Sequence, residues 1–314
     1  MHKRVYGVIG ISSVMANWNA DFSGFPKTTS DGSIFGSDKA LKYPMKKMWE
    51  NQGEKVLYIK SFKFSEGKDN VVNLVPRALK ERYQYIFKEE VKKDSSKEVL
   101  TNLFTAIDVM NFGATFAEVG NNISITGAVQ IGQGFNKYQL ASPEEQQILS
   151  PFRDATKDGK KEKDEEARNS TLGTKIVCNE AHYFYPFVVN PMAYNEYKEL
   201  EVTRGYTEED YEKFKEAALC SATSFATNSK VGCENEFALF VETDIDTYLP
   251  NLSEYIQFEK KENQNIITFT APDLIKDMGK KIRFIEVYYN PYTTILNCHI
   301  EGAKTYNIFT KKEV

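Results

Sequence analysis

The sequence predicts an α+β fold, in which an antiparallel sheet carries helices on one face. Several segments alternate apolar and polar residues, as half-buried strands do, and others repeat apolar residues every three or four positions, as amphipathic helices do. The two kinds of segment intermix without strict strand–helix alternation, which favours an α+β arrangement. The β-α-β-β-α-β order of ferredoxin-like domains is the leading candidate.

A long polar loop and a lysine-rich helix dominate the N-terminal part of the chain. Residues 17–36 are rich in Asn, Gly, Ser, Thr and Asp, and loops of this length are often functional. Ser37 or Asp38 can cap a helix over residues 39–51, in which Pro44 predicts a late start or a kink. The other expected elements are strands at 4–13 and 56–64, helices at 75–92 and 97–110, strands at 123–131 and 175–190, a helix opened by Thr207 and Asp210, and strands at 237–242, 266–270 and 283–289.

The composition excludes several classes of function. The 314 residues are 41% hydrophobic, enough for a substantial core, and no apolar stretch is long enough to span a membrane. The N-terminus lacks the apolar core of a signal peptide, so we expect a cytoplasmic protein. Four cysteines and three histidines are scattered without metal-ligand spacing, so we expect no metal and no cofactor.

Charge is unevenly distributed along the chain. The net charge is −4, whereas nucleic-acid-binding domains are often strongly basic, so any such surface must be local. Residues 137–175 include a charge-dense stretch with few apolar residues, which predicts a flexible, exposed insertion. Lys39, Lys42 and Lys46 fall on one face of the predicted helix. They form either a solvated face or a surface that contacts phosphates.

Two interpretations also remain open for the aromatic and glycine positions. Trp18, Phe22 and Phe25 of the loop either stack on bases or pack into the core. Gly127 interrupts a strand, which marks a bulge or the close approach of another backbone. Gln130 then either bonds a ligand or faces solvent.

The sequence TLGTK at residues 171–175 is a weak candidate for a phosphate site. Gly173 permits a turn with positive φ, and Thr171 and Lys175 offer donors suited to a phosphate. The segment lacks the G-x-x-x-x-G-K-[ST] pattern of a P-loop. His182 follows in an aromatic strand, where such residues are more often core than a stacking platform.

Catalytic motifs are absent from the sequence. It contains no G-x-S-x-G, H-E-x-x-H or zinc-deaminase pattern. Asp21, Asp31 and Asp38 are the only clustered acids near the polar loop. They could hold a metal or activate a hydroxyl, but turn formation and helix capping explain them more simply.

Several of these segments together resemble a known family, the backbone subunit of the type I CRISPR surveillance complex (Cascade) of the I-B and I-C branch, in the repeat-associated RNA-binding superfamily. The segments that carry the resemblance are 17–26 with 37–48 (SDKALKYPMKKM), 124–131 (SITGAVQI), 171–175 (TLGTK) with 182–191, and 205–210 (GYTEED) leading to 237–242. They occur in the family's order and spread across most of the chain.

The resemblance implies a fold and a role. Such proteins have a ferredoxin-like (RRM-like) palm with finger and thumb insertions, so the chain is expected to be a single palm domain over residues 1–314, with an RNA-facing loop at 17–36 and a thumb region at 137–175. Several copies assemble along one guide RNA (crRNA), without catalysis. The implied RNA-binding residues are Asn19, Lys27, Lys39, Lys42, Lys46, Gly127, Gln130, Thr171, Gly173, Lys175 and His182.

The implied partners follow from that role. They are crRNA, target DNA through the guide, other copies of the chain, other Cascade subunits and the CRISPR RNA-processing endonuclease, with no membrane. A guide of variable sequence is best held by its backbone, which leaves the base edges free to pair. Two alternatives are an RNA-cleaving backbone subunit that uses Asp21 or Asp31, and a small-molecule enzyme, for which the sequence offers no positive sign.

Overall fold

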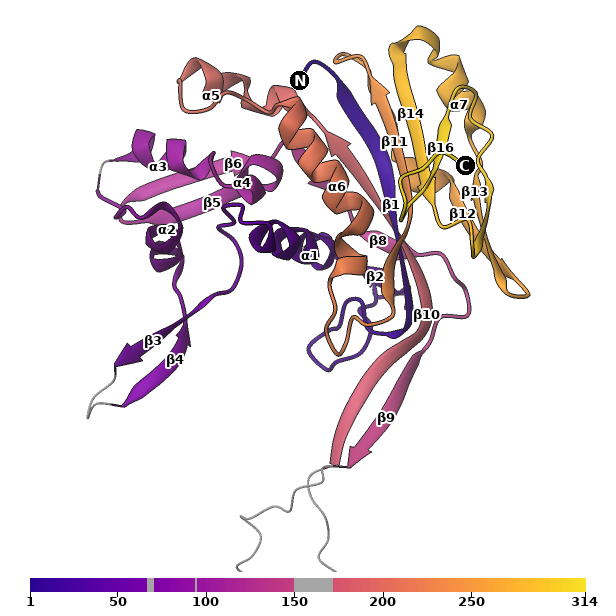
Figure 1. Ribbon diagram of the computed structural model, residues 1–314, viewed down its shortest axis with the longest axis horizontal. Helices are drawn as coiled ribbons and strands as arrows, with labels where there is room; N and C mark the ends of the chain where they lie inside the picture. Colours follow the sequence, from indigo (N-terminus) through magenta and orange to yellow (C-terminus); the bar gives the residue numbers. More distant parts are fainter. Residues whose placement is uncertain (67–70, 94, 150–171) are drawn as a thin grey trace, which may run out of the picture.

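A nine-stranded sheet forms the centre of the molecule (Figure 1). The computed structural model describes residues 1–66, 71–93, 95–149 and 172–314. The sheet strands follow the order β16-β14-β11-β1-β10-β8-β2, and β7 and β9 also pair with β10. The pairs are antiparallel except for β14 with β16, which are parallel. The predicted antiparallel α+β architecture is therefore present, with one parallel pair at an edge.

The strands and helices have the following bounds. The strands are β1 (Arg4–Ala16), β2 (Phe35–Gly36), β3 (Phe62–Glu66), β4 (Val72–Pro76), β5 (Gly113–Glu118), β6 (Asn121–Thr126), β7 (Val129–Ile131), β8 (Gly134–Asn136), β9 (Pro143–Leu149), β10 (Leu172–Val189), β11 (Cys233–Thr243), β12 (Ile256–Lys261), β13 (Gln264–Phe269), β14 (Ile282–Tyr289), β15 (Thr294–Asn297) and β16 (Lys304–Asn307). The helices are α1 (Asp38–Asn51), α2 (Leu79–Phe87), α3 (Ser96–Leu103), α4 (Ile107–Phe112), α5 (Asn195–Glu199), α6 (Glu208–Ser224) and α7 (Pro272–Asp277), with short 3₁₀ turns η3 (Pro191–Tyr194), η4 (Leu252–Tyr255) and η5 (Gly279–Lys281).

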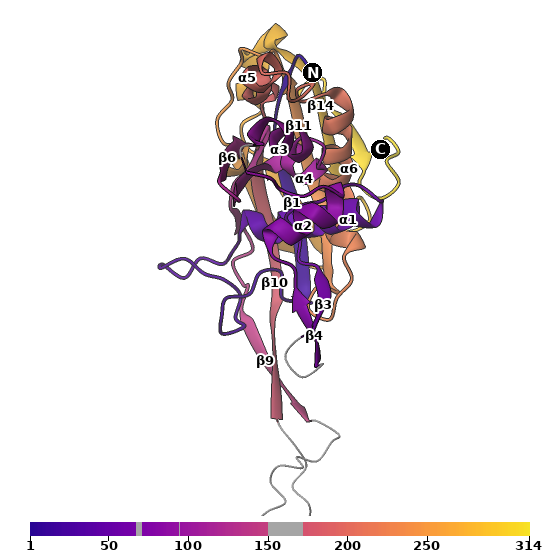
Figure 2. The ribbon, with the colours of Figure 1, turned by 90° about the vertical axis from the view of Figure 1, so that its left-hand side faces the viewer.

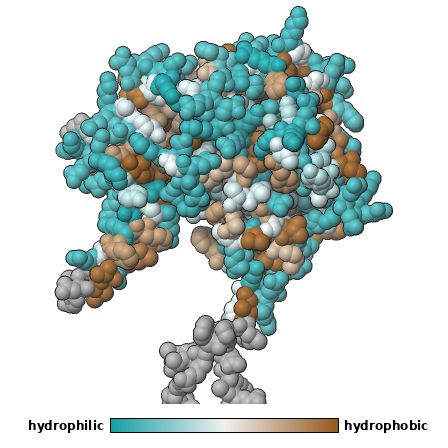
Figure 3. Space-filling model, viewed as in Figure 1, coloured by the Kyte–Doolittle hydropathy of each residue, from teal (hydrophilic) through white to brown (hydrophobic). Residues whose placement is uncertain are grey.

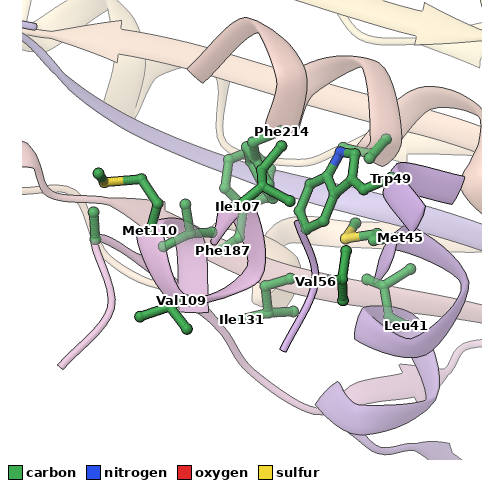
Figure 4. Packing of buried hydrophobic residues seen from close by; sticks show 14 of the residues in the cluster. Leu41, Met45, Trp49, Val56, Ile107, Val109, Met110, Ile131, Phe187 and Phe214 are labelled. Carbon is green, nitrogen blue, oxygen red and sulfur yellow. The ribbon is translucent and has the colours of Figure 1, made fainter. Parts of the chain in front are cut away.

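Both faces of the central sheet are covered. The alternation along β1 sends Val5 and Ile9 into a core under α1, α4 and α6, while Tyr6 and Val8 point into a second core under β12, β13 and α7. Figure 4 shows part of the first core, where Trp49 of α1 and Phe214 of α6 pack near Phe187 of β10. The sequence predicted helices on one face, and the small sheet on the other face was not anticipated.

Two hairpins project from the body (Figures 1 and 2). The β3–β4 hairpin extends below α2, and β9 pairs with the first part of β10 to form a longer arm. We call the first the prong and the second the arm. Residues 150–171, which include most of the predicted flexible insertion, lie outside the described residues.

Several predicted element boundaries are wrong. The helix expected at 97–110 is two helices, α3 and α4, and the strand expected at 123–131 is split between β6 and β7, which belong to different sheets. Only part of the strand expected at 56–64 forms, because the backbone N–H groups of Leu57 and Tyr58 donate to the carboxylate of Asp108 instead of to a neighbouring strand. The helix expected at 75–92 begins only at Leu79, after β4.

Candidate nucleic-acid interface

An open hollow lies between the polar loop, the start of α1 and strand β8. Its volume is about 410 Å³. We call it the α1 hollow, and its lining residues are Lys27, Thr29, Phe35, Ser37, Asp38, Lys39, Gln133 and Phe135. Two residues that the sequence singled out, Lys27 and Lys39, thus come together at one place on the surface.

The polar loop is anchored by buried contacts at its base. Trp18 is 1% exposed, and its indole N–H donates to the hydroxyl of Tyr185 at 2.6 Å. The Lys230 ammonium donates to the backbone carbonyl of Asn17 at 2.6 Å and to that of Trp18. Trp18 is therefore a core residue and no stacking platform, whereas Phe22 is fully exposed.

Polar side chains of the loop shape its turns. Asn19 accepts a bond from the backbone N–H of Ser37 at 2.7 Å, which ties the loop to the start of α1. The Asp21 carboxylate accepts from the backbone N–H of Ser23 at 2.8 Å, and Asp31 accepts from the hydroxyl of Thr29. The bond from Thr29 lowers the pKa of Asp31. Both aspartates therefore act in turn formation.

Helix α1 separates the three predicted lysines into different environments. Ser37 caps the helix at the N–H of Ala40, and Pro44 lies inside it without ending it. Lys39 is exposed at the first turn. The Lys42 ammonium pairs with Asp38 at 2.9 Å, so the helix itself neutralises this charge.

Lys46 points into the molecule. Its ammonium lies 3.9 Å from the Asp108 carboxylate and donates to the carbonyl of Tyr58 at 3.3 Å. Burial lowers the pKa of Lys46 despite the nearby carboxylate. Of the three lysines, only Lys39 therefore leaves its charge exposed and unpaired within the described chain.

Two aromatic rings form the wall of the α1 hollow. Phe35 of β2 pairs directly with Phe135 of β8, and their ring centroids lie 6.0 Å apart. The ammonium of Lys27 lies 5.6 Å from the Phe35 ring centroid. Sequence reasoning missed Phe135 and Gln133, although the pattern Gly132-Gln-Gly134-Phe135 was a usable signal, since a large ring flanked by small residues is easily left uncovered.

The α1 hollow combines features that suit a phosphate-linked chain of bases. The exposed ammonium groups of Lys27 and Lys39 can attract a phosphate, whereas the N–H of Ala40 at the start of α1 is already capped by Ser37. Phe35 and Phe135 offer ring faces on which bases can stack, irrespective of sequence. Asp38 is the acid in the lining, and it is paired with Lys42.

The segment 124–131 lies elsewhere and has a different role. Gly127 is buried, and a Cβ there would clash with the backbone of Phe112 and Gly113. Of the two interpretations, close approach of another backbone is correct, and the neighbour is this chain. The expected contact of Gly127 with RNA is thus contradicted. Gln130 is exposed, and its amide donates to the carbonyl of Gly127 at 2.8 Å.

The segment at 171–175 forms a strand and no turn. Gly173 pairs with Ile148, and Lys175 pairs with Gln146, within the ladder of the arm. Gly173 does not adopt positive φ, so the predicted phosphate-binding turn is wrong. Thr171 lies outside the described residues.

His182 is buried in an ionic cluster. It is 1% exposed, its Nε2 lies 3.0 Å from Glu180 and its Nδ1 lies 2.8 Å from Glu236. Its ring stacks on Phe258 at 3.9 Å between centroids. Burial opposes protonation of the imidazole, but the two carboxylates outweigh it and raise the pKa of His182 to about 9. A residue so enclosed cannot contact RNA, which contradicts the expectation.

The comparison with known families decides the identity. A family model described as "CRISPR-associated protein Cas7" matches residues 3–277. The chain belongs to the Cas7 family. This agrees with the resemblance seen in the sequence, and it covers the α1 hollow, both hairpins and the whole of β1 to α7.

A solved structure shares the fold of this Cas7-family chain. A chain of a "CRISPR RNA-guided surveillance complex, pre-nicking" superposes with a TM-score of 0.58 at 13% identity, covering 97% of this chain and 96% of that one. A chain of a second "CRISPR RNA-guided surveillance complex" gives a TM-score of 0.47 at 13% identity, with 90% and 88% covered. No curated protein matches the sequence.

The described part of the chain contains no group of three or more His, Cys, Asp or Glu placed to hold a metal ion. Its four cysteines are free thiols. No helix within the described ranges is long and apolar enough to cross a membrane.

Proposed function

We propose that this Cas7-family chain is a non-catalytic backbone subunit of a type I CRISPR surveillance complex, of the I-B or I-C kind. Several copies bind side by side along one crRNA and present it for pairing with target DNA in antiviral defence. The other partners are the remaining Cascade subunits and the endonuclease that processes the RNA. The observation that carries the proposal is the α1 hollow, where Lys27 and Lys39, which have no carboxylate partner in the described chain, meet the rings of half-buried Phe35 and exposed Phe135 on a protein of net charge −4.

The parts of the fold have proposed roles. The chain is one palm domain over residues 1–314, and the central sheet with α1 and α6 is its ferredoxin-like palm. The elements from β3 to β6 are the finger. The arm, with the rest of residues 137–175, is the thumb, which folds over RNA held by the next copy. Residues 17–36 are the RNA-facing loop, whose rigid anchoring at Trp18 supports a fixed RNA path.

The absence of catalysis is part of this proposal. The carboxylates of Asp21 and Asp31 are engaged in bonds that shape their own turns. An RNA-cleaving subunit would need one of them beside the scissile phosphate. Metal-dependent cleavage of RNA complementary to the guide, abolished by Asp21→Ala or Asp31→Ala, would replace the scaffold role with the cleaving one.

The first experiment is purification of the tagged chain from cells that co-express a CRISPR array and the neighbouring genes. The expected result is processed guide RNA of uniform length with several copies of the chain on each RNA. The Lys27→Ala/Lys39→Ala variant should recover less RNA, whereas Lys47→Ala, which removes a lysine paired with Glu50, should not. Random RNA fragments on a monomeric protein would contradict the proposal.

A further inference from the structure

The prong carries an apolar face that the described chain leaves uncovered. In its ladder Phe62 pairs with Pro76, Phe64 with Leu74 and Glu66 with Val72. Side chains two positions apart on a strand share a face, so the apolar residues among these all point to the same side. Those residues are Phe62, Phe64, Val72, Leu74 and Pro76, and each is exposed, with Phe64 at 74%.

The opposite face of the prong is used by the protein itself. Lys63 pairs with Glu81 of α2, and Val75 is half-covered. The exposed face is the outward one, and Figure 3 shows apolar residues along the projecting prong. A two-stranded hairpin is marginally stable alone in water, and contiguous apolar patches usually mark interaction sites. The prong is therefore built to be covered by another molecule.

A matching recess exists on the same chain. A hollow of about 350 Å³ lies between the starts of β1 and η4 and the ends of β7 and β10. Its floor is largely apolar, formed by Ile131, Pro186, Val188, Leu249 and Leu252. We call it the η4 hollow. Tyr248, next to Leu249, is 69% exposed and extends the apolar surface at its edge.

Most of the charge around the prong and the η4 hollow is complementary, and the exception is Arg4 of β1, whose guanidinium lies 5.1 Å from the Tyr248 ring centroid. Lys60, Arg77 and Lys80 lie at the base of the prong, and within the described chain none of them pairs with a carboxylate. The segment 244–254 beside the η4 hollow contains three acids and no lysine or arginine. Of these acids Asp246 and Glu254 are exposed, and Asp244 pairs with Arg283.

We propose that the prong of one copy docks in the η4 hollow of a second copy of this chain. The η4 hollow is lined by Tyr6 and Gly7 at the start of β1. That end of β1 lies near the mark N, whereas the prong projects downward from the body in both ribbon views (Figures 1 and 2). Contacts between two different patches of identical chains repeat head to tail, and they produce open filaments when the rotation between copies does not close a ring. The inference deepens the proposed function, because it names the surfaces that join neighbouring copies on the RNA.

The size of the contact sets its strength. A stable interface buries about 1,000 Å² or more in total, which one short hairpin cannot supply. The contact is therefore weak between free copies. It becomes effective when RNA holds two copies side by side and raises their effective concentration.

A disulfide-trapping experiment tests the pairing directly. Phe64→Cys is placed in one tagged copy and Asn251→Cys, at the exposed rim of the η4 hollow, in a second. Both copies also carry Cys220→Ser and Cys298→Ser, which remove the partly exposed native thiols. Mild oxidation on an RNA long enough for several copies should give a 64–251 disulfide. Tyr292→Cys, 76% exposed and remote from the η4 hollow, replaces the Asn251→Cys partner as the matched control.

Other linkage patterns would overturn the proposal. A 64–64 disulfide in place of 64–251 would mean that two prongs pair with each other. Trapping at residue 292 as efficient as at 251 would mean random collision. Photo-crosslinking of residue 64 to RNA in place of protein would make the occupant a nucleic acid.

A second variant separates this inference from the proposed function. Phe64→Ser/Leu74→Ser changes two exposed residues, so it should fold normally. It should keep its affinity for an RNA that holds one copy, but neighbouring copies should bind each other about tenfold or more weakly, since apolar burial is lost. Unchanged cooperativity of the Phe64→Ser/Leu74→Ser variant on a long RNA would refute the docking. Failure of the unmodified protein to bind RNA at all would instead refute the proposed function.

Discussion

The α1 hollow and the His182 cluster use similar groups in opposite ways. Each places a cation near an aromatic ring, with the Lys27 ammonium 5.6 Å from the Phe35 centroid and His182 stacked on Phe258. His182, however, is enclosed and flanked by the carboxylates of Glu180 and Glu236. Lys39 is exposed and has no carboxylate partner in the described chain.

The difference separates charge that stabilises the fold from charge available to a ligand. Lys260 completes the His182 cluster by pairing with Glu180 at 2.6 Å. The positive and negative charges of the cluster then balance, so it attracts an external phosphate only weakly. The α1 hollow keeps a positive surplus open to solvent, where a phosphate can replace water. The following predictions test this distinction, from the largest expected effect to the smallest.

The substitution His182→Gln should destabilise the protein most. It leaves Glu236 buried without its cation, and breaking such a pair costs about 3 to 5 kcal/mol. Denaturant unfolding would measure the loss of free energy. The exposed His299→Gln should unfold like the unmodified protein. A His182→Gln variant of normal stability but poor RNA binding would reverse the assigned roles.

Stability should also depend on pH through His182. Its folded pKa of about 9 lies above the ordinary value of 6.5, so its contribution is fully present below pH 6.5 and is lost as the pH rises through 9. The difference corresponds to about 3 kcal/mol. Unfolding curves between pH 6 and 10 would show the decline, and His182→Gln should flatten it. If the stability of His182→Gln declined equally steeply with pH, other titratable groups would be the cause.

The substitution Phe135→Leu should weaken RNA binding without affecting the fold. Phe135 is 41% exposed, and loss of stacking costs about 1 to 3 kcal/mol per base. Binding titrations with a short single-stranded RNA would measure the change. Phe309→Leu is a matched control, since Phe309 is 42% exposed and lies near the C-terminus. Equal losses in both variants would remove the α1 hollow from the RNA path.

The substitution Lys39→Ala should have the smallest effect, visible mainly in its salt dependence. Losing one phosphate contact lowers the slope of log affinity against log salt by about 0.7 for a single strand. Lys46→Met should leave that slope unchanged, because the Lys46 ammonium faces Asp108. If Lys46→Met lowered the slope and Lys39→Ala left it unchanged, Lys46 and not Lys39 would be the residue that contacts phosphate.

Local sequence patterns predicted the elements whose stabilising contacts are local. The alternation in β1 marks both of its faces, Ser37 caps α1 and Thr207 with Asp210 caps α6, as expected. Each depends on residues within one or two turns or on a period of two. The family was likewise recognised from short segments in order, and the match over residues 3–277 confirms it.

Contacts between distant segments defeated the same reasoning. The Asp108 carboxylate accepts hydrogen bonds from the backbone N–H groups of Leu57 and Tyr58, so the strand expected at 56–64 does not form at these residues. The same carboxylate faces the ammonium of Lys46, which buries this expected RNA-binding residue. His182 likewise has a distant partner in Glu236, 54 residues away, whereas its other partner Glu180 lies two residues away on the same strand. Nothing local distinguishes a lysine or histidine with such a partner from one without, so the candidate site was predicted only in part.

Strand β10 has a mechanical consequence. It is 18 residues long, and Cys178 faces both Ala16 in the body and Pro143 in the arm. The arm is thus the continuation of a central strand, and no break in β10 separates it from the body. Inserting two residues into each arm strand would lengthen the arm by about 7 Å and keep every side chain on its present face. Inserting one residue into each strand would turn every side chain beyond the insertion to the opposite face. The length of the arm can therefore change only in steps of two residues per strand if its side chains are to keep their faces.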